Sequence, residues 1–201
     1  MRFAKQGLLR WIGHRDVARC FERWFRRAAL ALRRSEGFHP KPRMTVASAL
    51  AVGIAGCEEV VEFELSETCT AEEIRRRLEQ CQPPFAISAL EVLPPGTAKA
   101  QVRSASYEVQ VPPARRAGLE GRVATLRSHV SYPIVRPGRH APVDLAEQLE
   151  ELAFAGDRLH MRLRVGQQGS AGPRDVLSAL ELLDLEQDGV CLMRTAVELC
   201  P

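Results

Sequence analysis

The sequence predicts an α+β fold of two tandem ferredoxin-like halves, each with the order βαββαβ and the second more elaborated. Apolar residues change between strand and helix spacing in this order, and the second half partly repeats the first. A Pro- and Gly-containing linker at residues 94–103 separates predicted domains at 1–95 and 104–201. The 201 residues are 45% apolar and 26% charged, a globular composition that excludes disordered and collagen-like chains.

The first half is divided by its apolar spacing and by one capping signal. Thr70 followed by Glu73 forms a capping box that opens the second helix. The first helix takes its apolar face from Val17, Cys20, Phe21, Trp24 and Ala28, with Phe25 nearer the edge. A strand, a helix, two strands, a helix and a strand are predicted at residues 3–12, 14–32, 44–50, 58–65, 70–81 and 85–93.

The second half shows the same order with one long insertion. Gly156 and Asp157 form the turn of a predicted hairpin, and Pro173 occupies the first turn of a helix, where proline is favoured. Residues 136–148 form the insertion, after a short extended piece at 134–135. The six main elements are predicted at residues 107–111, 114–129, 149–154, 159–165, 173–183 and 190–199.

Charge is distributed unevenly along the chain. Residues 1–43 hold twelve Arg and Lys against three acids, a net charge of +9. Residues 44–95 hold nine Glu against three Arg, a net charge of −6. A basic segment this concentrated predicts an anionic partner, with nucleic acid the first candidate.

The first helix carries arginines opposite its apolar face. Arg15, Arg19, Arg23 and Arg26 fall within one narrow arc of the helical wheel. Such a face can simply be solvated, and a high-GC genome also favours arginine. The guanidinium fork, however, binds phosphate bidentately, so the four arginines are candidate phosphate ligands.

The segment Ser35 to Arg43 reads SEGFHPKPR and is predicted to be a stiff loop. An aromatic ring, an imidazole and two cations there would suit an unpaired base and its phosphates. The alternative is a structural loop in which the aromatic ring fills the core. For Phe38 alone the core position is the preferred interpretation, and for the three polar residues together we favour binding. The candidate ligands in the loop are Phe38, His39, Lys41 and Arg43.

Two histidines in basic surroundings could cleave RNA by general acid–base catalysis. His14 precedes the first helix and could face His39 of the loop, while Asp16 would act at the helix start through dipole and capping effects. The six cysteines show no C-x-x-C pair, so we expect free thiols, no metal ligands and no cofactor. No apolar run resembles a signal peptide or a membrane span, so we expect a cytoplasmic protein that does not contact membranes.

The motifs together identify a resemblance. The segments FAKQGLLR (3–10), GHRD (13–16) and SEGFHPKPR (35–43) resemble the bacterial DUF2344 family, also called radical-SAM-associated proteins. The chain departs from the family pattern at Gly13, where the family has serine. The matching motif positions are Lys5, Gly7, His14, Asp16, Gly37, Phe38, Pro40, Pro42 and Arg43.

The resemblance implies a domain found alone or fused behind a cobalamin-binding radical SAM protein, and it transfers no catalytic residue. We therefore expect an accessory RNA-binding domain, without activity of its own, that positions RNA for a separate radical SAM enzyme. The expected RNA contacts are Lys5, Arg15, Arg19, Arg23, Arg26, Phe38, His39, Lys41 and Arg43. The alternatives are a metal-independent RNA-processing enzyme using His14, Asp16 or His39, and an adaptor that docks a radical SAM subunit.

Overall fold

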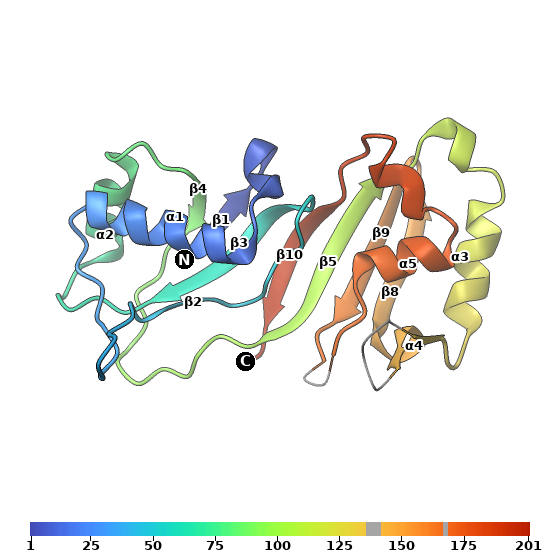
Figure 1. The fold of residues 1–201 in the computed structure, drawn as a ribbon. Coiled ribbons are helices and arrows are strands. Elements are labelled where there is room, and N and C mark those ends of the chain that lie inside the picture. The colour runs from blue at the N-terminus through green and yellow to red at the C-terminus, as the bar shows by residue number, and fades with distance from the viewer. Residues whose placement is uncertain (136–141, 167–168) are drawn as a thin grey trace. The chain divides into compact units, whose positions relative to one another are not determined.

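The chain is a mixed α+β protein that divides into two compact units, Met1–Gln101 and Val102–Pro201 (Figure 1). The computed structural model describes residues 1–135, 142–166 and 169–201. The polar and apolar spacing along the chain therefore predicts the fold class correctly at the α+β level.

Unit 1 contains an antiparallel sheet with the strand order β4-β1-β3-β2. Its two longer helices cross the sheet between the strands that they connect (Figure 1). The elements are β1 (Arg2–Lys5), the 3-10 helix η1 (Gly7–Trp11), α1 (His14–Arg27), β2 (Met44–Val46), β3 (Ala55–Phe63), α2 (Ala71–Glu79) and β4 (Ala86–Ala89).

An aromatic cluster forms the core of unit 1 and orients α1. Phe21 of α1 lies edge-on to Phe3 of β1, with ring centroids 4.8 Å apart, and stacks on Phe85 at 4.7 Å. Trp24 is fully buried, and its indole Nε1 donates to the carbonyl oxygen of Leu78 in α2 at 2.9 Å. Because aromatic pairs and a buried hydrogen bond both depend on geometry, α1 has one fixed rotational setting.

The predicted strand over residues 3–12 is wrong beyond Lys5. Gly7 adopts a φ of +59°, a left-handed conformation that ends the strand and begins η1. The carbonyl oxygen of Arg10 accepts bonds from the backbone N–H of Gly53 at 2.9 Å and from Lys5 Nζ at 3.3 Å. Residues 7–11 are therefore a short helix fixed to the turn before β3.

The first helix ends at Arg27, five residues before its predicted end. Ala29 has a φ of +52°, its N–H donates to Arg26, and the Leu30 N–H donates to the Phe25 carbonyl at 2.9 Å. This is a Schellman motif with alanine where glycine is usual. The missing glycine explains why the sequence pattern placed the end too late.

The capping signal of the second helix is confirmed. Thr70 Oγ1 accepts a hydrogen bond from the Glu73 N–H at 3.2 Å, and α2 begins at Ala71. Two neighbouring strands depart from their expected ranges: β2 stops at Val46, and β3 begins at Ala55.

Unit 2 contains an antiparallel sheet with the strand order β10-β5-β9-β8. Its strand β5 begins at Val102, inside the predicted linker, and two short elements that were not predicted precede β8. The elements are β5 (Val102–Gln110), η2 (Pro113–Arg115), α3 (Leu119–Ser128), β6 (Pro133–Ile134), β7 (Val143–Asp144), α4 (Leu145–Gln148), β8 (Leu149–Ala155), β9 (Arg158–Arg164), α5 (Pro173–Ala179), η3 (Leu183–Glu186) and β10 (Met193–Leu199).

Strand β9 shows how unit 2 separates its apolar and charged sides. Leu159, Met161 and Leu163 are buried, and the residues between them are arginines and a histidine at least partly exposed. The predicted hairpin between β8 and β9 is confirmed, with Gly156 at a φ of +63° in its turn. The expected insertion at 136–148 lies partly outside the described residues.

Candidate nucleic-acid interface

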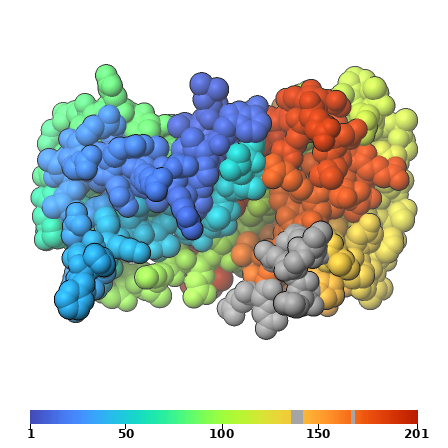
Figure 2. Space-filling model, viewed as in Figure 1, coloured from blue at the N-terminus to red at the C-terminus, as the bar shows by residue number. Residues whose placement is uncertain are grey.

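Helix α1 presents its arginines to solvent. Arg15, Arg19, Arg23 and Arg26 are all exposed, on the side of the helix away from the aromatic core. Figure 2 shows α1, in blue, along the viewed face of unit 1. The core contacts of Phe21 and Trp24 hold the helix in this setting, so the four guanidinium groups, here called the arginine ridge, share one surface.

Little acid neutralises the arginine ridge. Arg19 pairs with Asp16 at 3.3 Å, and Arg23 Nη2 donates to the Cys20 sulfur, also at 3.3 Å. Within the described parts of the chain, Arg15 and Arg26 form no ion pair. The ridge therefore carries a net positive field that an anionic ligand can neutralise.

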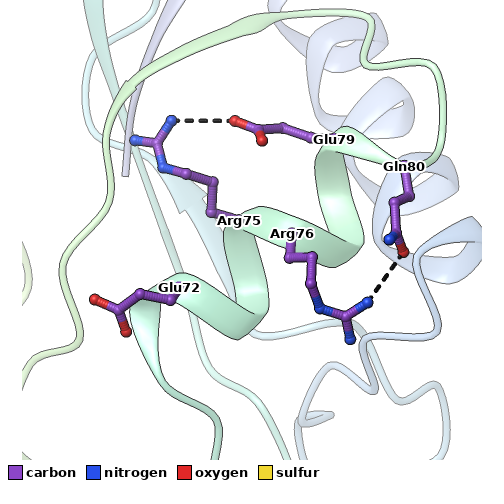
Figure 3. Close-up of a pocket in the computed structure, with 5 residues that line it drawn as sticks. All are labelled: Glu72, Arg75, Arg76, Glu79 and Gln80. Atoms are coloured by element: carbon purple, nitrogen blue, oxygen red, sulfur yellow. Dashed lines mark hydrogen bonds and ion pairs between the residues drawn. The ribbon is translucent and has the colours of Figure 1, made fainter.

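Helix α2 provides the contrast within the same unit. Figure 3 shows a shallow hollow on α2, lined by two arginines, two glutamates and a glutamine. Arg75 pairs with Glu79 at 3.3 Å, and Arg76 pairs with Glu73 at 2.9 Å. Glu73 also accepts from Arg77 at 2.7 Å, and these arginine hydrogen bonds lower the pKa of its carboxyl group. The hollow is already neutralised by its own helix, which makes it a poor phosphate site.

The arginines of β9 in unit 2 are neutralised in the same way. Arg158 pairs with Glu108, and Arg164 pairs with Glu150 at 3.1 Å. Arg162 pairs with Glu151, also at 3.1 Å. Arginine content alone therefore does not mark a phosphate site, whereas arginine without a neighbouring acid distinguishes α1.

The segment predicted as a stiff loop is closed at its base like a hairpin. The Ser35 N–H donates to the Lys41 carbonyl at 2.8 Å, and the Lys41 N–H donates to Ser35 Oγ at 3.0 Å. Arg34 Nη1 donates to the Pro40 carbonyl at 3.2 Å. These bonds, together with two prolines, restrict the tip that carries the exposed side chains.

Phe38 lies at this tip and is fully exposed, at 102% of its reference area. The interpretation that Phe38 fills the core is therefore wrong, because the aromatic cluster of unit 1 is complete without it. His39 and Lys41 are also exposed. Arg43 differs, because its guanidinium lies 3.2 Å from the Glu64 carboxylate, which Arg33 also approaches at 3.9 Å.

Lys5 does not lie on the surface. It is 2% exposed, and its ammonium donates to the carbonyl oxygen of Arg10. Phe3 and Lys5 share one face of β1 because side chains alternate along a strand, and that face is the buried one. Lys5 is therefore removed from the expected nucleic-acid contacts.

The two candidate catalytic histidines are not brought together. His14 begins α1 just after η1, which bonds to Gly53 ahead of β3, whereas the base of the His39 loop bonds through Arg43 to Glu64, just after β3. The nine residues of β3 separate these positions by about 26 Å at roughly 3.3 Å per residue. The expectation that His14 faces the loop is wrong, and Asp16, paired with Arg19, stays with His14 at the start of α1.

An exposed aromatic residue that the sequence analysis missed lies beside the start of the arginine ridge. Trp11 is 57% exposed, with the Arg10 guanidinium 4.9 Å from its ring centroid. Leu8 of the same short helix is also exposed. A predicted strand over residues 3–12 hid this feature, although a tryptophan between two polar turns was available as a signal.

No group of three or more potential metal ligands is found among the residues that the structure describes. All six cysteines are free thiols, and Cys200 is exposed. No helix in the described ranges has both the length and the apolar character needed to cross a membrane.

These features define an α+β protein of two units with an exposed basic helix and a closed basic loop. The sequence model of a bacterial family, described as an uncharacterized protein conserved in bacteria (DUF2344), matches residues 1–173. The chain therefore belongs to the DUF2344 family. No curated protein matches it at a significant level.

Proposed function

We propose that this DUF2344 protein is an RNA-binding accessory protein that works with a separate, cobalamin-binding radical SAM enzyme in RNA modification or processing in the cytoplasm. The observation that carries the RNA part is the arginine ridge: Arg15 and Arg26 have no acidic partner among the described residues. The radical SAM partner rests on the family resemblance alone. No residue is proposed to act as a catalyst.

RNA fits the surface better than an acidic protein does. Guanidinium groups match phosphate oxygens bidentately, and the exposed rings of Phe38 and Trp11 offer faces on which unpaired bases can stack. An adaptor that docks an acidic partner needs the charge but has less use for isolated exposed aromatic rings. The ridge and the aromatic residues together favour a nucleic acid with single-stranded character.

We also propose that each unit is a ferredoxin-like half, so that the chain is a tandem of two. In support, unit 1 has the strand order β4-β1-β3-β2 and unit 2 has β10-β5-β9-β8, all antiparallel. If the strands of the main sheet are counted within each unit, both orders are fourth, first, third, second. This is the order expected when two βαβ crossovers are split around a common sheet.

Fluorescence-anisotropy titration of a labelled 12-nucleotide single-stranded RNA at two salt concentrations tests the RNA proposal. Affinity should fall steeply with salt, and the variant Arg15→Gln/Arg26→Gln should bind more weakly with a shallower slope, by up to about 0.7 per lost contact. The matched control is Arg75→Gln/Arg76→Gln, which removes the same charge from the neutralised helix α2. It should bind like the unmodified protein.

Two outcomes would overturn the proposal. The first is no RNA binding even at low salt, which would instead favour the adaptor. The second is equal weakening by both double variants, which would mean that net charge matters and the ridge does not.

A further inference from the structure

We propose that Trp11 and Phe38 are two base-stacking platforms at opposite ends of the arginine ridge, and that one strand of RNA bridges them. This inference rests on the proposed RNA binding and adds its substrate class: an unpaired segment long enough to reach both rings. Trp11 and Phe38 are the two aromatic residues of unit 1 with strongly exposed rings, at 57% and 102%.

The Trp11 platform is held rigidly. Helix η1 is fixed through the Arg10 carbonyl, which accepts from Gly53 and Lys5, and Gln6 Nε2 lies 3.6 Å from the Cys57 sulfur. The Arg10 guanidinium, 4.9 Å from the indole centroid, adds positive charge beside the ring. A fixed ring with a cation beside it is the combination that binds a base and its neighbouring phosphate.

The Phe38 platform is held by the closed loop. Ser35 and Lys41 join the base of the loop, and Gly37 allows the tight tip with a φ of +123°. His39 and Lys41 are exposed beside the ring. Phe38 therefore repeats the pattern of Trp11: a solvent-facing aromatic ring on a restrained backbone with cations next to it.

The two platforms lie at opposite ends of β3, as His14 and His39 do. Helix α1, with 14 residues and a length of about 21 Å, runs between them and carries the ridge. Figure 2 shows these blue segments of unit 1 on one face. A separation of about 26 Å needs about eight stacked nucleotides at 3.4 Å each. The structure thus predicts a minimum length for tight binding.

Oligouridylates of 4 and 12 nucleotides, titrated against Trp11→Ala, Phe38→Ala and the double variant, test this inference. The 12-mer should lose about tenfold affinity with each single variant and about a hundredfold with both. The 4-mer cannot bridge the platforms, so each single variant should cost it about twofold or less, with a large loss only in the double variant. Trp11→Phe should retain most of the affinity, and Val130→Ala, which trims an exposed apolar side chain of unit 2, should bind normally.

Tryptophan emission gives an independent readout. Trp24 is fully buried and hydrogen-bonded, so quenching on addition of the 12-mer reports Trp11. If the 12-mer binds with full salt dependence but neither quenches emission nor responds to the two variants, the platforms are wrong while the proposed RNA binding stands. Equal single-variant losses for both oligomer lengths would overturn the bridging strand. Absence of any binding would overturn the proposed function itself.

Discussion

Ser35 and Lys41 exchange two hydrogen bonds across the base of the exposed loop. The Ser35 N–H donates to the Lys41 carbonyl at 2.8 Å, and Ser35 Oγ accepts from the Lys41 N–H at 3.0 Å. Because both ends of the segment are joined, Phe38 at the tip is presented on a closed turn. The loop that the sequence marks with two prolines is thus fixed by hydrogen bonding as well as by proline.

Removing the Ser35 hydroxyl should loosen this loop without unfolding the protein. In Ser35→Ala the Lys41 N–H loses its partner, a cost of about 0.5–1 kcal/mol for an exposed bond, while the backbone bond between the residues remains. Amide exchange at Lys41 should become faster, as measured by hydrogen–deuterium exchange. Ser35→Thr, which keeps the hydroxyl, should exchange like the unmodified protein. Unchanged exchange in Ser35→Ala would show that the hydroxyl does not hold the loop.

Glycine at the end of α1 should stabilise the protein. Ala29 is exposed at a φ of +52°, where a Cβ is unfavourable, and its N–H donates to the Arg26 carbonyl. Ala29→Gly should raise the free energy of unfolding by up to about 1 kcal/mol, after allowing for the greater chain entropy of glycine. Urea unfolding measures this gain. The control is Ala18→Gly within α1, which should lower stability by about 1 kcal/mol; a loss in both variants would contradict the argument.

A hydroxyl at the start of α1 should also stabilise it. Gly13 is the N-cap residue, with extended backbone angles and no side chain to cap the helix. A Cβ there would lie 3.8 Å from Asp16 Oδ2, an ordinary contact, so serine fits. Gly13→Ser should add a few tenths to about 1 kcal/mol of unfolding free energy, because its oxygen can accept from the N–H at the third helical position. Thermal unfolding should show a higher Tm, and Gly13→Ala, which lacks the oxygen, should not.

Regular spacing made the inner face of α1 and the start of α2 predictable. Val17, Phe21 and Trp24 repeat at helical intervals, and Thr70 with Glu73 is a local signal that needs no tertiary contact. The same reasoning could have found the burial of Lys5, since it lies two residues after Phe3 in a strand.

Other features depend on contacts that no local pattern encodes. The end of α1 follows from a positive φ at alanine, a conformation that the residue type does not advertise. The exposure of Phe38 follows from the aromatic core being filled by Phe3, Phe21 and Phe85 from three separate segments. The separation of His14 from His39 requires knowing which end of β3 each segment meets.

The Glu73 carboxylate should make the stability of unit 1 depend on pH in acid. Hydrogen bonds from Arg77 and Arg76 lower its pKa from the ordinary 4.5. A lowered folded-state pKa means that the stabilisation is present above the ordinary value and is lost as pH falls through the lower, folded value. The difference in urea midpoint between the unmodified protein and Glu73→Gln should therefore be largest near pH 7 and shrink below pH 4.5. A difference that stays constant between pH 7 and pH 3 would show that the ion pairs do not contribute.

Neutralising Glu64 should strengthen RNA binding. Its carboxylate lies 3.2 Å from Arg43 and 3.9 Å from Arg33, beside the base of the exposed loop. Glu64→Gln removes one negative charge and leaves both guanidinium groups available for phosphate, so affinity should rise several-fold and more steeply at low salt. The backbone bonds of Glu64 to Arg33 and Arg43 do not involve the side chain and should persist.

The matched control for Glu64→Gln is Glu151→Gln, which makes the same charge change beside Arg162 of unit 2. Anisotropy titrations at two salt concentrations compare the two variants directly. A gain confined to Glu64→Gln would place phosphate near the loop base, because only there does the freed charge lie next to the RNA path. Equal gains would reduce the effect to net charge, and a loss would mean that Glu64 holds the two arginines in their binding positions.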